Sequence, residues 1–377
     1  MKILWFLDKQ FDIALDKATW IEVISHLQKN HIVHLVTGFK KDKIQFDELN
    51  KKIIYFESSY IPFLNRIITY HYQVKCFRKL VKIHKPDVVF LNVKNFVLVK
   101  EVKNFRKKHQ YKAYLDIRSL PVYSSRLKNT LDSYLFKKSL KIAANKFDGV
   151  TYITDEIRQY CVMNYDLKEH RSEIWTSGVN TDLFEPETRT SPDNTFRLIY
   201  HGNIADNRGL DNVITALRNL GDLDIEFLML GSGIGANGLK NLAGELKLDK
   251  RVRIHSPVPY KDVPKYINEA DAGILPFQDC PGWNTSSPIK LFEYLSCGKP
   301  VVATRIPAHT NVLLEKNFVS WAEKSSPEAF SKAIMDVYNN REEYKNMGLE
   351  ARQFVLENYT WTKQAEKLES FLCDSNA

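Results

Sequence analysis

The chain has 377 residues, of which 44% are hydrophobic and 12% aromatic. These proportions support a large buried core in about two domains, and they exclude a disordered chain, a collagen and a small disulfide scaffold. Basic residues outnumber acidic residues by 54 to 45, but the excess is confined to residues 1–180, which carry 32 basic and 18 acidic side chains. We therefore expect an anionic partner for the first half of the chain only.

The five cysteines lie far apart, with no C-x-x-C spacing and no histidine at ligand spacing. This pattern predicts neither a disulfide framework nor a zinc site, and it favours a reducing cytosol. The opening apolar run, 3–7, is too short for a signal peptide, and no later stretch approaches the roughly 18 apolar residues of a membrane span. We predict a cytoplasmic protein that is soluble or bound peripherally to the inner face of the cell membrane.

In the first half, short apolar runs alternate with helix-period segments. Strands are predicted at 3–7, 32–37, 88–92, 113–116, 150–154 and 173–175, and helices at 20–28 and 126–146. This βαβ rhythm predicts a parallel sheet. The turn at 178–180 and the Pro-, Thr-, Ser- and Asp-rich stretch at 186–194 predict a domain linker.

The same rhythm restarts after the predicted linker. Strands are predicted at 197–201, 225–230, 252–255, 272–276 and 301–304, helices at 211–220, 239–246 and 263–270, and a helical tail at 329–372. The fold class is therefore α/β, with two doubly wound parallel sheets in domains 1–185 and 186–358. We expect the final helix, 359–377, to pack back on the first domain.

The segment 283–304 predicts a short helix that would hold an anion. Ser287 is a preferred N-cap, Pro288 suits the first helical position, and Gly298 suits the left-handed position that ends a helix. The positive end of such a helix is a ready anion site. The amides expected to be free are those of Ile289, Lys290 and Leu291.

Three charged side chains extend this prediction. Lys290 lies in the first helical turn, where the helix dipole disfavours a cation, so a negative ligand such as a diphosphate is expected. Arg208, which precedes a helix in another loop, offers a forked donor to the same diphosphate. Glu293 lies one turn into the helix, and a carboxylate suits a ribose diol. The alternative is that Arg208 and Glu293 are ordinary solvated residues of a structural helix and loop.

Six motifs occur in order along the chain, at 178–184, 202–209, 231–233, 251–260, 270–276 and, as S-P-I-K-L-F-E-Y, at 287–294. Together they resemble the retaining, nucleotide-sugar-dependent glycosyltransferases of family 4. These enzymes have the GT-B fold, in which two Rossmann-like domains face each other across a cleft. Six ordered matches are far more specific than any single one.

The resemblance implies transfer of a sugar, of hexosyltransferase type, from a UDP- or GDP-linked donor to a glycan or lipid-linked acceptor in the biosynthesis of a cell-surface polysaccharide such as lipopolysaccharide, capsule or exopolysaccharide. Arg208 and Lys290 would bind the diphosphate and Glu293 the ribose. No metal or other cofactor is expected, because basic side chains and helix amides stabilise the departing nucleotide. The other expected donor-binding residues are Gly202, Asn203, Gly231, Val258, Pro259, Thr285, Ser286, Ser287, Pro288, Ile289 and Leu291.

Three positions depart from the family pattern. Thr285 replaces the first glutamate of the usual E-x7-E pair, so the polar loop at 284–287 must contact the sugar. Asn203 replaces a basic residue, which makes Lys290 more important. The glycine pair expected after the first strand is absent from 8–17, so the resemblance does not identify the acceptor.

On the acceptor side, Asp116 ends a predicted strand of the first domain. Related enzymes often place a histidine or an aspartate near the reacting hydroxyl, so Asp116 is our candidate for orienting or deprotonating the acceptor. The alternative is a structural aspartate that pairs with Arg118.

The segment 61–146 carries 20 basic and only four acidic residues, with aromatic side chains interleaved. Such a composition suits a helix on an anionic bilayer, although solvated helix faces would explain part of it. Nucleic-acid binding is disfavoured because no binding motif is present. An NAD-dependent dehydrogenase is disfavoured because the strand after the G-x-G-x-x-A match at 231–236 ends without an acidic residue. A sugar-nucleotide epimerase and a non-catalytic sugar-nucleotide-binding homologue stay open.

Overall fold

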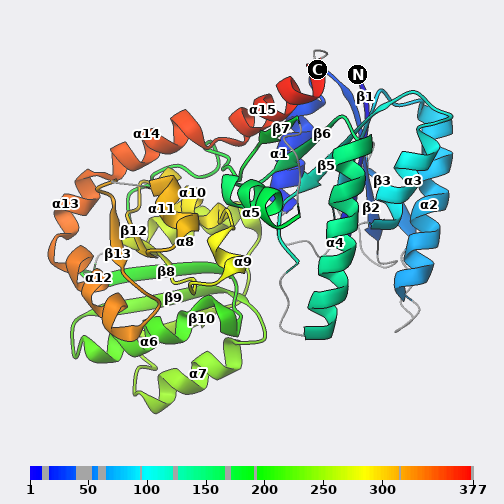
Figure 1. Cartoon of the computed structure of the whole chain (residues 1–377). Helices are drawn as coiled ribbons and strands as arrows, with labels where there is room; N and C mark the ends of the chain where they lie inside the picture. The colour runs from blue at the N-terminus through cyan, green and yellow to red at the C-terminus, as the bar shows by residue number, and fades with distance from the viewer. Residues whose placement is uncertain are drawn as a thin grey trace. The chain divides into compact units, whose positions relative to one another are not determined.

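The computed structural model describes residues 1–10, 17–39, 53–57, 65–93, 96–121, 126–165, 171–190, 193–313 and 316–374 (Figure 1). The atypical loop predicted at 8–17 lies mostly outside these residues. Contacts divide the chain into two compact units. The first unit contains residues 1–176 and 361–377, and the second contains residues 177–360.

The first unit is built on a seven-stranded parallel sheet in the order β3-β2-β1-β4-β5-β6-β7. The order reverses at β1, which is the arrangement of a doubly wound sheet. The strands are β1 (Lys2–Gln10), β2 (Ile32–Phe39), β3 (Ile53–Glu57), β4 (Val88–Asn92), β5 (Lys112–Ile117), β6 (Gly149–Tyr152) and β7 (Ser172–Ile174).

Helices cover both faces of this sheet. Successive side chains of β1 point to opposite faces, so each packs on a different helix. Phe6 packs on Phe77 of α2, with 5.6 Å between ring centroids, whereas Trp5 packs on Trp20 of α1 at 5.5 Å. The helices are α1 (Lys17–Leu27), α2 (Asn65–His84), α3 (Phe96–Phe105), α4 (Arg126–Lys146), α5 (Asp155–Tyr165) and α15 (Trp361–Cys373). Within the described part of the chain, no helix is both long and apolar enough to cross a bilayer.

The last helix, α15, packs against α1 and β7 and so belongs to the first unit. Asn30 donates a hydrogen bond to Glu369 Oε1 at 3.0 Å, and the Thr176 amide donates to Gln364 Oε1 at 3.0 Å. The first unit is therefore assembled from the two ends of the described chain.

The second unit is built on a six-stranded parallel sheet in the order β10-β9-β8-β11-β12-β13, with helices on both faces (Figure 1). Its strands are β8 (Phe196–Asn203), β9 (Ile225–Ser232), β10 (Val252–His255), β11 (Ala272–Leu275), β12 (Val301–Thr304) and β13 (Val319–Ala322). Its helices are α6 (Leu210–Asn219), α7 (Ala236–Glu245), α8 (Val263–Asn268), α9 (Pro281–Asn284), α10 (Ile289–Ser296), α11 (Pro307–Leu313), α12 (Pro327–Asn339), α13 (Arg341–Asn346) and α14 (Gly348–Asn358). The predicted α/β class with two doubly wound sheets is confirmed.

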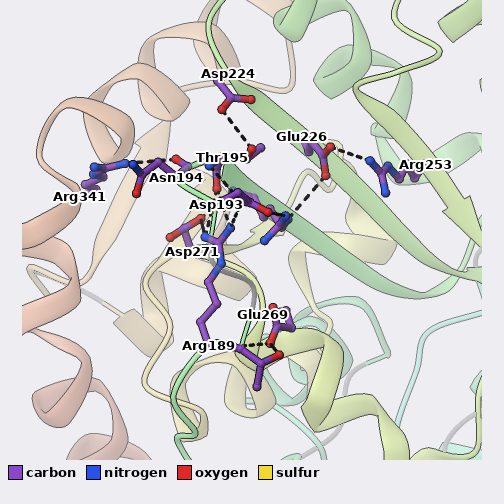
Figure 2. Close-up of polar contacts among 12 residues, drawn as sticks. Arg189, Asp193, Asn194, Thr195, Asp224, Glu226, Arg253, Glu269, Asp271 and Arg341 are labelled. Atoms are coloured by element: carbon purple, nitrogen blue, oxygen red, sulfur yellow. Dashed lines mark hydrogen bonds and ion pairs between the residues drawn. The ribbon is translucent and has the colours of Figure 1, made fainter.

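The amino end of this second sheet carries a network of ion pairs (Figure 2). Arg189 bonds to Asp193 at 2.6 Å and to Asp271, which precedes β11, at 3.2 Å. Arg189 thereby fixes the 186–194 segment, where composition predicts a linker, to the second unit. The other pairs are Arg197 with Asp193 at 2.6 Å and Arg253 with Glu226 at 2.8 Å.

Candidate functional site

The candidate site lies at the carboxyl end of the second sheet, where β8 and β9 end side by side. Gly202 faces Gly231 in the register of these strands, and a Cβ atom on Gly231 would lie 1.9 Å from Gly202 O. The close approach therefore requires glycine at this position. After β8, the 3₁₀ turn Asp206–Arg208 ends at Gly209, which has a φ of 72° and begins α6.

Arg208 lies on aromatic rings at the end of this 3₁₀ turn. Its guanidinium carbon is 4.2 Å from the centre of the Trp283 ring and 5.3 Å from that of Phe277. Trp283 is itself fixed, because it stacks on Phe277 at 4.7 Å and donates a hydrogen bond to Asn207 O at 3.0 Å. Among the described residues, no carboxylate pairs with Arg208, and burial lowers the pKa of its guanidinium.

Lys290, in the first turn of α10, shares the Phe277 ring with Arg208 and also lies over Tyr200. Its Nζ lies 4.1 Å from the centre of the Tyr200 ring and 5.5 Å from that of Phe277. Burial and then the charge of Arg208 hold the pKa of Lys290 well below its usual value, against the opposing effect of Glu293. No carboxylate in the described ranges lies within ion-pair distance of Lys290. Two cations thus share one aromatic platform and repel each other.

Glu293 is buried behind this cation pair, one turn further along α10, and only 1% of it is exposed. Its Oε1 accepts a hydrogen bond from the Tyr260 hydroxyl at 2.7 Å, and its Oε2 lies 2.9 Å from His201 Nε2. His201 is held in turn by Tyr294, because the rings meet edge to face at 5.3 Å and the His201 amide donates to the Tyr294 hydroxyl at 3.2 Å. Both carboxylate oxygens of Glu293 therefore have protein partners.

The start of α10 corrects three predictions. The N-cap is Pro288 rather than Ser287, and Pro288 lies before the helix rather than in its first turn. The Ser287 hydroxyl accepts a hydrogen bond from the Ser177 amide at 3.2 Å instead, so it serves the segment that enters this unit. The Leu291 amide donates to Pro288 O at 3.1 Å and is not available to an anion. The prediction for Gly298 is confirmed, since it has a φ of 67° directly after the helix cap.

The remaining predicted donor-binding residues surround the same end of the sheet. Thr285 and Ser286 close the short helix α9, with hydroxyls that donate to Pro281 O at 3.0 Å and Trp283 O at 2.7 Å. Asn203 is the last residue of β8. Val258 and Pro259 directly precede the 3₁₀ turn Tyr260–Asp262, which carries the partner of Glu293.

Asp116, the predicted acceptor residue, lies in the first unit at 0% exposure. Its Oδ1 accepts hydrogen bonds from the Thr151 hydroxyl at 2.8 Å and from Trp175 Nε1 at 3.2 Å. Arg118 lies over the Trp175 ring, 3.8 Å from its centre. These bonds tie β5 to β6 and Trp175, so Asp116 has structural partners other than the expected Arg118, and its catalytic role stays a prediction.

No role was predicted for the aromatic and histidine side chains of the site. The sequence offers only a weak indication of their role, because each of these residues lies in or close to a predicted motif. These residues are Tyr200, His201, Tyr260, Phe277 and Trp283.

Two family models cover most of the chain. Residues 18–183 match the model described as Glycosyltransferase Family 4, and residues 183–354 match that of glycosyl transferases group 1. An uncharacterized glycosyltransferase of Methanocaldococcus jannaschii is 23% identical over 252 residues, which cover 64% of this chain and 62% of that protein. The matches span 23% and 62% of the lengths of two further curated relatives.

Solved structures share the fold over almost the whole chain. Sucrose-phosphate synthase from Thermosynechococcus elongatus has a TM-score of 0.82 at 15% identity and 98% coverage of both chains. HepE of Anabaena, in complex with UDP-glucose, has a TM-score of 0.75 at 14% identity and 99% coverage of both. WaaG, a glycosyltransferase involved in lipopolysaccharide biosynthesis, has a TM-score of 0.72 at 15% identity, covering 99% of this chain and all of that one. The predicted GT-B fold is thereby confirmed.

Proposed function

Because this chain belongs to the glycosyltransferases of family 4, with two family models that together span residues 18–354, we propose that it transfers a sugar from a nucleoside diphosphate to an acceptor hydroxyl. The observation that carries this proposal is the pair Arg208 and Lys290. Both cations lie on aromatic rings at the carboxyl end of a doubly wound sheet, where ligands of such folds bind. Neither has a carboxylate partner among the described residues.

A diphosphate supplies the missing negative charge. The Arg208 guanidinium can donate two parallel hydrogen bonds to phosphate oxygens, and Lys290 acts as a point charge beside them. As the bond between the sugar's anomeric carbon and the phosphate oxygen breaks, negative charge develops on the leaving diphosphate. The two cations stabilise that charge. The acceptor hydroxyl gives its proton to the departing phosphate oxygen while its own oxygen bonds to the anomeric carbon on the face that the phosphate leaves, so that the configuration is retained.

The donor's ribose is assigned to Glu293, and its base to the backbone at Val258 and Pro259. A buried carboxylate is a suitable partner for vicinal hydroxyls, and Val258 and Pro259 adjoin Tyr260, which contacts that carboxylate. The structural similarity to HepE, which was crystallised with UDP-glucose, supports a nucleotide-sugar donor. We expect a UDP- or GDP-linked sugar and no metal ion.

The acceptor is proposed to be a glycan or lipid-linked intermediate of a cell-surface polysaccharide, met at the inner face of the membrane. The neighbouring helices α2, α3 and α4 support this proposal, because exposed lysines gather on α2 and α4 together with exposed Tyr72, Ile83 and Tyr134. Each lysine near an anionic bilayer contributes roughly 1 kcal/mol of attraction. The exposed lysines are Lys75, Lys79, Lys82, Lys137, Lys138, Lys141 and Lys146. The similarity to WaaG, which is involved in lipopolysaccharide biosynthesis, points to the same class of pathway.

Turnover of radiolabelled UDP- and GDP-sugars tests the reaction. We expect transfer of the label to a lipid-linked acceptor from a membrane extract, with an anomeric configuration in the product, read by NMR, that equals the donor's. Arg208→Ala should abolish transfer while leaving the thermal unfolding temperature unchanged. Release of a free sugar-nucleotide epimer would identify an epimerase, and binding without turnover would identify a non-catalytic homologue.

Cosedimentation with phosphatidylglycerol vesicles tests the membrane surface. The protein should sediment with the vesicles at low salt and be released at high salt, because salt screens exposed charges. Replacing Lys137, Lys138 and Lys141 by glutamate should abolish sedimentation. The matched control replaces three exposed lysines of the second unit, Lys240, Lys250 and Lys332, and should have a much smaller effect.

A further inference from the structure

The carboxylate assigned to the ribose is not accessible in this structure. Only 1% of Glu293 is exposed, and Tyr260 and His201 each contact one of its oxygens, at 2.7 Å and 2.9 Å. Because the carboxylate is buried under these side chains, a ribose reaches Glu293 only when one of them moves aside. This step rests on the proposed function, because it takes Glu293 as the ribose ligand.

His201 is firmly held. It lies within β8, where it pairs with Leu230 of β9, its ring packs on Tyr294, and its amide donates to the Tyr294 hydroxyl. His201 is only 9% exposed. Movement of this buried side chain would break its contact with Tyr294.

Tyr260, by contrast, lies outside the sheet. It lies in a three-residue 3₁₀ turn, and it is 38% exposed, so its outer side faces solvent. Its ring leans on Phe184, with 5.3 Å between the ring centroids. A change of side-chain rotamer would remove the hydroxyl from Glu293 without disturbing a strand.

We infer that Tyr260 determines how strongly the site prefers a ribose: its hydroxyl occupies the position on Glu293 Oε1 that a ribose hydroxyl takes when the donor binds. Binding then exchanges one hydrogen bond to the carboxylate for another. The ribose hydroxyls consequently add little affinity in the natural protein, because the bond that they form replaces one that is already present.

Removal of the Tyr260 hydroxyl should therefore strengthen ribonucleotide binding. In Tyr260→Phe, Glu293 Oε1 loses its donor in the free protein, and a buried carboxylate that lacks a donor is unstable until a ribose hydroxyl supplies one. A nucleotide without ribose hydroxyls cannot supply this donor, so its affinity should not rise.

The test compares UDP and GDP with their 2′,3′-dideoxy forms by titration calorimetry. The ribose preference is the Kd of the dideoxy form divided by the Kd of the ribonucleotide. Tyr260→Phe should lower the Kd of the ribonucleotide about fivefold and leave that of the dideoxy form within about twofold, so this ratio should rise. An unchanged or reduced preference would overturn the inference and make Tyr260 a fixed support for Glu293. Tyr266→Phe is the matched control, because its hydroxyl, in the same segment, lies 3.4 Å from His255 Nε2 and away from Glu293. It should leave the preference unchanged.

The double variant Tyr260→Phe, Glu293→Gln separates failure of this inference from failure of the proposed function. If UDP or GDP binds the natural protein but Tyr260→Phe does not raise the ribose preference, only the role of Tyr260 is wrong. If the rise persists in the double variant, or if neither UDP nor GDP binds the natural protein, the assignment of the site is wrong and the inference falls with it. Thermal unfolding of each variant verifies that the fold is intact.

Discussion

At the amino end of the second unit's sheet, arginines are paired with carboxylates, whereas at its carboxyl end two cations lie on aromatic rings. Arg189 and Arg197 share the carboxylate of Asp193, and Arg253 pairs with Glu226 (Figure 2). Arg208 and Lys290 contact the rings of Trp283 and Tyr200 instead. Charge is thus balanced by carboxylates at one end of the sheet, whereas at the other, among the described residues, the two cations have no carboxylate within ion-pair distance.

The pKa values also differ between the two ends of the sheet: that of Arg197 is raised, and those of Arg208 and Lys290 are lowered. Burial opposes the charge of Arg197, but the hydrogen bond and charge of Asp193, with the charge of Glu226, raise its pKa overall. Burial lowers the pKa of Arg208, and burial together with Arg208 lowers that of Lys290. The paired arginines therefore stabilise the folded chain, whereas burial of the two cations on the rings costs stability, and a bound anion would offset that cost.

Replacing one arginine by methionine at each end of the sheet tests this contrast most strongly. Arg208→Met should weaken UDP or GDP binding roughly 10- to 100-fold, because each hydrogen bond to a charged group contributes about 1.5–3 kcal/mol. Its thermal unfolding temperature should stay the same or rise. Arg189→Met should leave nucleotide affinity unchanged and lower the unfolding temperature. Calorimetric titration and thermal unfolding read both effects, and the reverse pattern would refute the comparison.

A buried histidine beside Phe277, at the carboxyl end of the sheet, predicts that the free energy of unfolding depends on pH. His309 is 0% exposed, its ring lies 5.6 Å from that of Phe277, and its Nδ1 lies 2.8 Å from Thr304 O. Burial lowers the pKa of His309 to about 4, against the opposing hydrogen bond to Thr304. Since the unfolded chain binds this proton near pH 6.5, stability should fall as the pH drops from about 6.5 towards 4, by about 2 kcal/mol at pH 5.

His309→Asn isolates this effect. The variant keeps a donor near the position of Nδ1 but has no titrating group, so its unfolding free energy should depend less on pH between 7 and 5. Denaturant unfolding at both pH values measures the difference. If the unfolding free energy of the variant falls equally steeply between pH 7 and 5, groups other than His309 cause the acid sensitivity.

The smallest expected effect concerns the ring beneath Arg208. Trp283→Leu should weaken UDP or GDP binding about fivefold, because a cation over an indole gains about 0.5–1 kcal/mol and the ring also fixes the guanidinium. Trp321→Leu is the control, since Arg305 lies 4.8 Å from the centre of that ring but pairs with Glu323 at 2.9 Å. It should leave nucleotide binding unchanged, as calorimetry would show; equal losses in both variants would count against a special role for Trp283.

Apolar runs predicted the buried strands well. The bounds of β4 and β12 are those predicted, because the central strands of a parallel sheet are buried on both faces and read as continuous apolar runs. The bounds of the edge strand β10 are also those predicted, although only Val252 of it is buried. Edge strands carry less of this signal. We did not predict β3, a short run after a lysine-rich segment, or β13, in which Ser320 interrupts the apolar run.

Part of the candidate site was also predictable. Arg208, Lys290 and Glu293 are the charged residues of short motifs at a strand end and a helix start, so local patterns found them. Tyr260 contacts Glu293 across 33 residues of chain, and the spacing of a sequence carries no record of such a contact. The N-cap at Ser287 was wrong for the same reason, since a long-range bond to Ser177 takes up its hydroxyl.

Because α15 belongs to the first unit, the first unit cannot complete its folding until the end of translation. The helix that packs on α1 and β7 leaves the ribosome only after every residue of the second unit has been synthesised. A nascent chain that ends at residue 176 therefore lacks the partners of Asn30 and Thr176. We expect the second unit to complete its folding first, although the first unit is mostly encoded ahead of it.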